Sequence, residues 1–125
     1  MARLFLWATA TVFIAFGLWG LSSPKAMVTS FGITLGGADG QTMIRASYGG
    51  FLIGEGLLFA WCAMSQARVQ FGLMSVILLT LPILLSRLFG MAVDGSSSPY
   101  HRAYVAIELV GVALALLLLR KVPKT

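Results

Sequence analysis

The sequence predicts an all-α integral membrane protein, a bundle of four membrane-crossing helices in which successive helices run antiparallel. Hydrophobic residues make up 58% of the 125 positions, and the mean hydropathy is +0.92. Charged residues make up only 10% of the chain, against roughly 25% in an ordinary soluble domain. Four long apolar stretches show no alternating pattern, which favours helices over a membrane barrel.

The four helices are expected to lie within a single domain, 1–125, and to span approximately 4–21, 44–64, 69–93 and 99–119. Each is close to the roughly 20 residues that cross a hydrocarbon core. Ser23 and Pro24 are residue types typical of a helix N-cap and first turn. They predict a short interfacial helix over 25–31, closed by Gly32, and the glycine-rich segment 36–40 is expected to be a loop.

The remaining connections are short. Residues 65–68 predict a tight turn, so the second and third helices are expected to be antiparallel neighbours. Asp94 and Gly95 open the next loop, and Ser98 and Pro99 begin the fourth helix as N-cap and first residue. A cleaved signal peptide is the alternative for the first apolar stretch, but that stretch is long and no A-x-A-like site follows it.

Lysine and arginine predict the orientation. The side of the membrane that holds both chain ends carries no acidic residue and five basic ones, Arg3, Arg68, Arg120, Lys121 and Lys124. The opposite side carries Lys25 and Arg102 together with Asp39 and Asp94. By the positive-inside rule, we expect both termini in the cytoplasm and the protein in the bacterial inner membrane.

Several function classes are disfavoured. The formal net charge is +5, but the basic residues form no clustered face of the kind that binds nucleic acid. Cys62 is the single cysteine and His101 the single histidine, so they cannot supply a tetrahedral metal site. The sequence shows no recognisable nucleophile and base pair and no phosphate loop. We therefore expect a non-enzymatic protein without a cofactor, with Cys62 as a packing residue.

Four ionisable residues fall within or beside the predicted helices: Arg45, Glu55, Arg87 and Glu108. On insertion scales a charge at mid-membrane costs about 2.5 to 3.5 kcal/mol, so each needs a partner or a purpose. Two are basic and two are acidic. The depth of Arg87 along its helix places it within reach of Glu108, Glu55 or both, which predicts a buried charge network.

Helical periodicity extends this network into a candidate pocket. Tyr48 shares a stripe with Arg45 and Glu55, and Tyr104 shares one with Glu108. The combination of tyrosines and charges predicts a polar pocket in the outer half of the bundle. Small residues are expected to let helices approach closely, namely Ala46, Gly50, Gly54 and Gly111.

Several motifs resemble one family over nearly the whole chain. The most specific is the run Ile44-Arg45-Ala46-Ser47-Tyr48-Gly49-Gly50, followed by Gly54-Glu55-Gly56, Ser86-Arg87, Asp94-Gly95, Ser98-Pro99 and Glu108. The stretch from Phe16 to Trp19, Pro24 and Phe31-Gly32 also match its first segment. These motifs are similar to a family of bacterial four-helix membrane proteins, the domain of unknown function 4345. The resemblance implies the architecture and a polar core at the matching Arg and Glu positions, and it implies no activity.

Three functional hypotheses remain open. In the leading one, the charge network stabilises the bundle, either with no ligand at all or while also lining a small pocket for a lipid-like or quinone-like molecule. The alternative is an accessory subunit of a larger respiratory or photosynthetic membrane complex. A proton-coupled carrier using Glu55 and Glu108 is the third. The expected partners are membrane lipids, other membrane subunits or further copies of the chain, and no nucleic acid.

Overall fold

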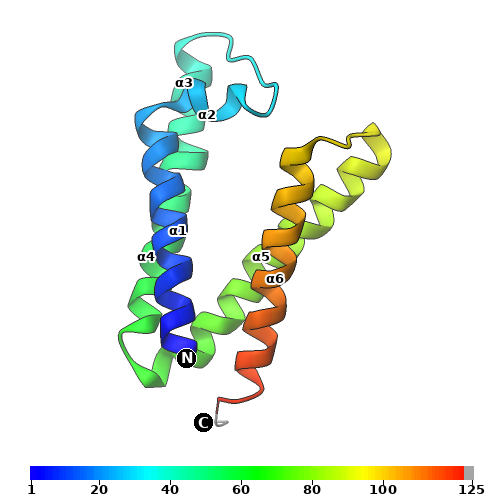
Figure 1. Cartoon of the computed structure of the whole chain (residues 1–125). Coiled ribbons are helices and arrows are strands. Elements are labelled where there is room, and N and C mark those ends of the chain that lie inside the picture. The colour runs from blue at the N-terminus through cyan, green and yellow to red at the C-terminus, as the bar shows by residue number, and fades with distance from the viewer. Residues whose placement is uncertain (123–125) are drawn as a thin grey trace.

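A computed structural model describes residues 1–122, which leaves Lys124 of the orientation argument outside the described residues. Within that range the chain folds into four long helices and one short helix after the first, without any strand (Figure 1). The elements are α1 (Ala2–Ser22), α2 (Pro24–Thr29), α3 (Ala38–Ile44), η1 (Arg45–Gly50), α4 (Phe51–Ala63), η2 (Gln66–Arg68), α5 (Val69–Asp94) and α6 (Pro99–Leu119). Elements α3, η1 and α4 follow one another without a break and form the second long helix.

Three helical segments have the length and apolarity of a membrane span: Ala2–Ser22, Gln66–Asp94 and Pro99–Leu119. The second long helix is continuous over 38–63, but the π-helical segment η1 divides it into shorter pieces. The protein is therefore a helical, multi-pass membrane protein.

The predicted helix boundaries are confirmed where local chemistry sets them. Pro24 is the first residue of α2, and Gly32 follows that helix with a φ of +76°. The Ser98 hydroxyl oxygen accepts a hydrogen bond from the Tyr100 N–H at 3.3 Å, as an N-cap does. Gly95 ends α5 in the left-handed conformation, with a φ of 67°.

The start of the second long helix was predicted too late. It begins at Ala38 instead of near 44, so only Gly36 and Gly37 of the predicted 36–40 loop lie outside it. Asp39 stands in the first turn, where a carboxylate is favoured by the positive end of the helix dipole. This contribution offsets the low helix propensity of Gly40.

The long helices form two antiparallel pairs (Figure 1). Helix α1 packs along η1 and α4, and α5 packs along α6. The two pairs meet at the end that holds both termini and the 65–68 turn, which we call the termini end. Their ribbons diverge toward the opposite end, which we call the loop end, where 30–37 and 95–98 connect the helices.

Glycines set the distance between α1 and the second long helix. A Cβ on Gly56 would lie 2.9 Å from the Ala10 carbonyl oxygen, and a Cβ on Gly17 would lie 2.9 Å from the Gly49 carbonyl oxygen. Real Cβ atoms do not approach backbone this closely, so any larger residue would separate the helices. Because lipid gives no hydrophobic driving force for helix association, the van der Waals contacts made at this close approach stabilise the helix pair.

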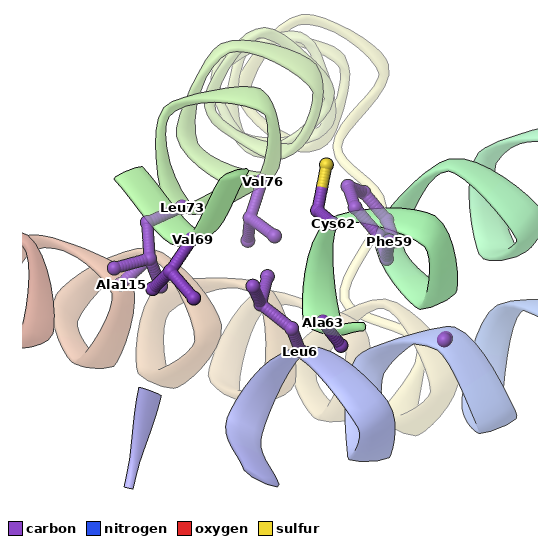
Figure 2. Packing of buried hydrophobic residues seen from close by; sticks show 9 residues of the cluster. Leu6, Phe59, Cys62, Ala63, Val69, Leu73, Val76 and Ala115 are labelled. Carbon is purple, nitrogen blue, oxygen red and sulfur yellow. The ribbon is translucent and has the colours of Figure 1, made fainter. Parts of the chain in front are cut away.

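The packed core lies at the termini end (Figure 2). Leu6, Phe59, Cys62, Leu73 and Ala115 are each fully buried, and they come from four different helices. The packing role predicted for Cys62 is confirmed, since its thiol lies inside this cluster. The core joins the two helix pairs where they meet.

Arginine side chains close the C-terminal ends of two helices. The Arg3 Nε donates to the Ala63 carbonyl at 2.7 Å, and Arg45 donates to the Leu21 carbonyl. Each of these two arginines comes from the antiparallel partner helix. It donates to a carbonyl at a helix end that accepts no hydrogen bond within its own helix. Arg68 donates to the Trp61 carbonyl at 3.0 Å and stacks over the Trp61 ring.

Candidate functional site

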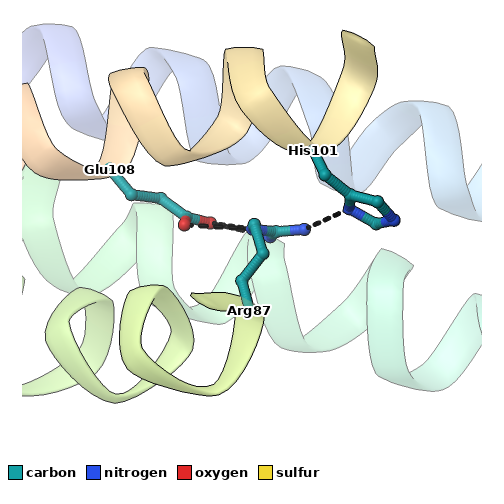
Figure 3. Close-up of polar contacts among 3 residues, drawn as sticks. All are labelled: Arg87, His101 and Glu108. Carbon is teal, nitrogen blue, oxygen red and sulfur yellow. Dashed lines mark hydrogen bonds and ion pairs between the residues drawn. The ribbon is translucent and has the colours of Figure 1, made fainter. Parts of the chain in front are cut away.

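Arg87 of α5 and Glu108 of α6 form an ion pair that joins the two helices (Figure 3). The Arg87 Nη2 lies 2.7 Å from Glu108 Oε1, and the Arg87 Nε lies 3.1 Å from Glu108 Oε2. Two parallel contacts of this kind fix the planes of the guanidinium and the carboxylate relative to each other. The Arg87 side chain is 22% exposed and that of Glu108 is 12% exposed.

Two further side chains of α6 contact the same guanidinium. The Arg87 Nη1 lies 3.4 Å from His101 Nδ1, and the guanidinium carbon lies 5.0 Å from the centre of the Tyr104 ring (Figure 3 for His101). Residues 101, 104 and 108 are three and four apart, so they share one face of α6. His101 was not among the site residues predicted from the sequence, although its spacing of seven residues from Glu108 on the same helix was available as a signal.

Aromatic rings link the two helix pairs beside the ion pair. The Phe31 ring centre lies 5.8 Å from that of Tyr104 and 6.5 Å from that of Tyr100. The Phe16 ring of α1 lies 6.4 Å from Tyr104 in an edge-to-face arrangement. Where the ribbons diverge, these side chains bridge α1 and the segment after α2 to α6.

The predicted four-residue charge network is smaller in the structure. Arg45 is exposed and donates to the Leu21 carbonyl, so it lies outside the network. Glu55 is 6% exposed, and neither of its carboxyl oxygens has a hydrogen-bond partner among the described residues. Only Arg87 and Glu108 of the four are brought together.

The π-helical segment explains why Arg45 was misplaced. The prediction assumed 100° per residue from Arg45 through Glu55, but η1 runs over 45–50 with wider turns. The wider turns change the angle between Arg45 and every residue of α4. Tyr48 lies within the same segment and is 42% exposed.

The small residues predicted for helix packing do not make close contacts within the chain. A Cβ built on Gly54 or on Gly111 would have no neighbouring atom within 4 Å, and Ala46 and Gly50 are exposed. The close approaches are made by other glycines instead, namely Gly17, Gly20, Gly49, Gly56 and Gly72. Glycine spacing alone did not indicate which face of a helix meets its neighbour.

Two hollows lie near the predicted site residues. One, of about 400 Å³, is lined by Pro82, Ile83, Ser86 and Arg87 on α5. The other, of about 630 Å³, lies where α1 meets α2 and includes Arg45. Tyr48, Glu55, Tyr104 and Glu108 line neither of them. Across residues 1–122, no group of three or more His, Cys, Asp or Glu side chains is placed to hold a metal ion.

Comparison with curated proteins gives no match, and comparison with solved structures gives none either. Comparison with family models gives a match over residues 1–119 to a family described as a domain of unknown function (DUF4345). That span includes every helix from α1 to α6 and the whole Arg87 site. The chain therefore belongs to the DUF4345 family of proteins.

Proposed function

We propose that this protein is a non-enzymatic component of the bacterial inner membrane that holds a lipid-like or quinone-like molecule beside the Arg87–Glu108 ion pair. The observation that carries the proposal is the incomplete burial of the pair. Arg87 is paired with Glu108 and yet 22% exposed, and it borders the hollow formed with Pro82, Ile83 and Ser86. A pair that served only to join α5 and α6 would not need an accessible guanidinium.

The chemistry around Arg87 suits a polar head with an apolar body. Guanidinium N–H groups donate to carbonyl and phosphate oxygens, and an arginine donates only. The Tyr104 ring lies 5.0 Å from the Arg87 guanidinium carbon and positions that group beside the hollow, although Tyr104 does not line the hollow itself. Besides Arg87, the hollow is lined by the apolar Pro82 and Ile83 and by the polar Ser86, a mixture that small-molecule sites commonly show.

A non-enzymatic role is supported by the state of the reactive groups. His101, the single histidine of the sequence, contacts a guanidinium and not a nucleophile. The Cys62 thiol is fully buried in the core at the termini end. Neither arrangement resembles the nucleophile and base pairs of covalent catalysis.

The ligand proposal is tested by extraction of the purified protein. The protein is isolated from membranes in a mild detergent, and its bound small molecules are extracted and identified by mass spectrometry. We expect a lipid-like or quinone-like molecule at near-equal stoichiometry, reduced in Tyr104→Leu and unchanged in Phe89→Leu. Phe89 is the control because it lies on α5 and is 70% exposed. Equal retention by both variants, or no bound molecule in the wild type, would overturn the proposal.

An accessory subunit of a larger membrane complex is the second candidate. It is favoured by the open space over Gly54 of α4 and Gly111 of α6, since small residues on an accessible helix face suit close approach by another helix. Native mass measurement after gentle extraction separates the two candidates. Stoichiometric co-purification with a large complex would favour the subunit role, whereas an isolated protein with a bound molecule would favour the first.

We also propose that both termini lie in the cytoplasm. The termini end carries Arg3, Arg68, Arg120 and Lys121 within the described residues, with no acidic residue beside them. The loop end carries Lys25, Arg45 and Arg102, together with Asp39 and Asp94. The larger number of basic residues at the termini end follows the positive-inside rule.

A further inference from the structure

An open groove of about 630 Å³ lies at the loop end, where α1 ends and α2 begins, separate from the Arg87 site. Its walls come from the end of α1, from α2, and from one face of α3 and η1. The lining residues are Ser22, Ser23, Pro24, Lys25, Ala26, Thr29, Ser30, Gln41 and Arg45. Every side chain among them is polar or basic, apart from Pro24 and Ala26.

The groove has the charge of an anion site. Lys25 and Arg45 are both exposed and bring two positive charges to it, and none of its described lining residues is acidic. Asp39, the acidic residue closest along α3, is not part of the lining. The two cations come from different elements, α2 and η1, and the fold brings them together across 20 positions of sequence.

Donors remain available in the groove after the internal hydrogen bonds are counted. The Thr29 and Ser30 hydroxyls donate to the carbonyls of Lys25 and Met27. One Nη of Arg45 donates to Leu21, and a guanidinium has five N–H groups in all. The Lys25 ammonium supplies three further donors. Strong donors and two positive charges together match the oxygens of a phosphate group.

The position of the groove indicates the source of that phosphate. Ser22 and Ser23 end α1, which is long and apolar enough to cross a membrane, so the groove lies at the level where hydrocarbon gives way to headgroups. We propose that the groove binds the phosphate of an anionic phospholipid headgroup. Free inorganic phosphate offers the same chemistry without the acyl chains, and it is the alternative source.

Lipid titration of the purified full-length protein tests this site. The protein in a non-ionic detergent is delipidated, and bound molecules are counted by native mass spectrometry as phosphatidylglycerol, diacylglycerol with the same acyl chains, or inorganic phosphate is added. We expect saturable binding of phosphatidylglycerol and at most weak binding of diacylglycerol and of phosphate. Removing one basic residue near the membrane surface is expected to weaken lipid binding about fivefold, from about 1 kcal/mol per charge.

The variant for this test is Lys25→Gln, because the hydrogen bond from the Thr29 hydroxyl goes to the backbone carbonyl of Lys25 and so survives the change. Arg102→Gln is the matched control, since Arg102 is an exposed basic residue at the loop end that does not line the groove. Weaker phosphatidylglycerol binding in the first and unchanged binding in the second would support the site. Equal binding of diacylglycerol, phosphate binding as tight as that of phosphatidylglycerol, or equal binding by both variants would overturn it.

This inference does not depend on the proposed function. Tyr104 lies outside the lining of the groove, so Tyr104→Leu is expected to keep wild-type phosphatidylglycerol binding. Lys25→Gln is likewise expected to keep the molecule proposed for the Arg87 site. Failure of the groove proposal can therefore be distinguished from failure of the ligand proposal at the Arg87 site.

Discussion

Arg87 and Glu108 lie 21 residues apart in the sequence and meet through two parallel nitrogen–oxygen contacts, the shorter of 2.7 Å. Their helices are joined by a loop of four residues between Asp94 and Pro99. The ion pair is therefore a second connection between α5 and α6, placed along the helices and not at their linked end. Removing one partner would leave the other as an uncompensated charge in an apolar setting.

A double-mutant cycle measures this coupling. Arg87→Ala and Glu108→Ala are each expected to lower the free energy of unfolding in detergent micelles. The double variant is expected to lose less free energy of unfolding than the two single variants lose together. The difference is expected to be about 0.5 to 3 kcal/mol, the usual range for residues in contact. Additive losses would show that the two side chains do not stabilise each other.

Glycine replacement tests the α1–α4 interface. Gly56→Ala is expected to lower the free energy of unfolding by about 1 to 3 kcal/mol, as overpacking does, because its Cβ would meet the Ala10 carbonyl oxygen at 2.9 Å. Gly54→Ala on the same helix is the control. Nothing lies within 4 Å of its Cβ, and alanine is favoured over glycine in a helix by about 1 kcal/mol. Equal losses in the two variants would place α1 against a different face of α4.

The arginine cap on α4 is expected to slow local opening. Arg3→Ala removes the donors to Ala63 and Met64, so the last turn of α4 loses the cap supplied by α1 and keeps the Arg68 donation to Trp61. The expected loss is about 1 kcal/mol, measured as faster hydrogen exchange of amides in that turn. Arg120→Ala is the comparison, because Arg120 is exposed and is given no side-chain hydrogen bond in the described part of the chain. Unchanged exchange in Arg3→Ala would contradict the cap.

Replacing Glu55 is expected not to lower the free energy of unfolding, in contrast to the changes above. Both of its carboxyl oxygens are buried without a hydrogen-bond partner among residues 1–122, so its replacement removes no hydrogen bond. Glu55→Leu is expected to leave the free energy of unfolding unchanged or to raise it, since an unpaired buried polar group costs about 1 to 3 kcal/mol. Chemical unfolding of wild type and variant measures the difference. A clear loss of stability would indicate a partner for the carboxyl, as the predicted network required.

Elements defined by local chemistry were predictable from the sequence. Ser98 and Pro99 begin α6, Pro24 begins α2, and Gly95 ends α5, because each position needs a particular backbone conformation or a particular donor. Arg87 was expected to reach Glu108, Glu55 or both, and the structure pairs it with Glu108. Antiparallel neighbours joined by a short loop place residues at similar depth side by side.

Relationships that depend on helix rotation were not predictable. Gly50 and Gly54 have the same four-residue spacing that packs helices in other proteins, but Gly49 and Gly56 are the glycines that meet α1. The two glycines of each pair share one face of the helix, and only the position of α1 determines which of the two faces is packed. The π-helical segment at 45–50 likewise moves Arg45 away from the charge network, and no sequence periodicity reports such a segment in advance.

Four membrane crossings are the central claim. The second long helix is the one whose crossing does not follow from its apolarity, since within residues 1–122 the three segments with membrane-span character lie elsewhere. Single cysteines at Gly36, Ala67 and Ser97, introduced with Cys62→Ser, test it through labelling of intact cells by a membrane-impermeant maleimide. We expect labelling from outside at Gly36 and Ser97 and protection of Ala67. If the cysteines at Gly36 and Ala67 instead label from the same side, the 38–63 helix does not cross the bilayer and the account is contradicted.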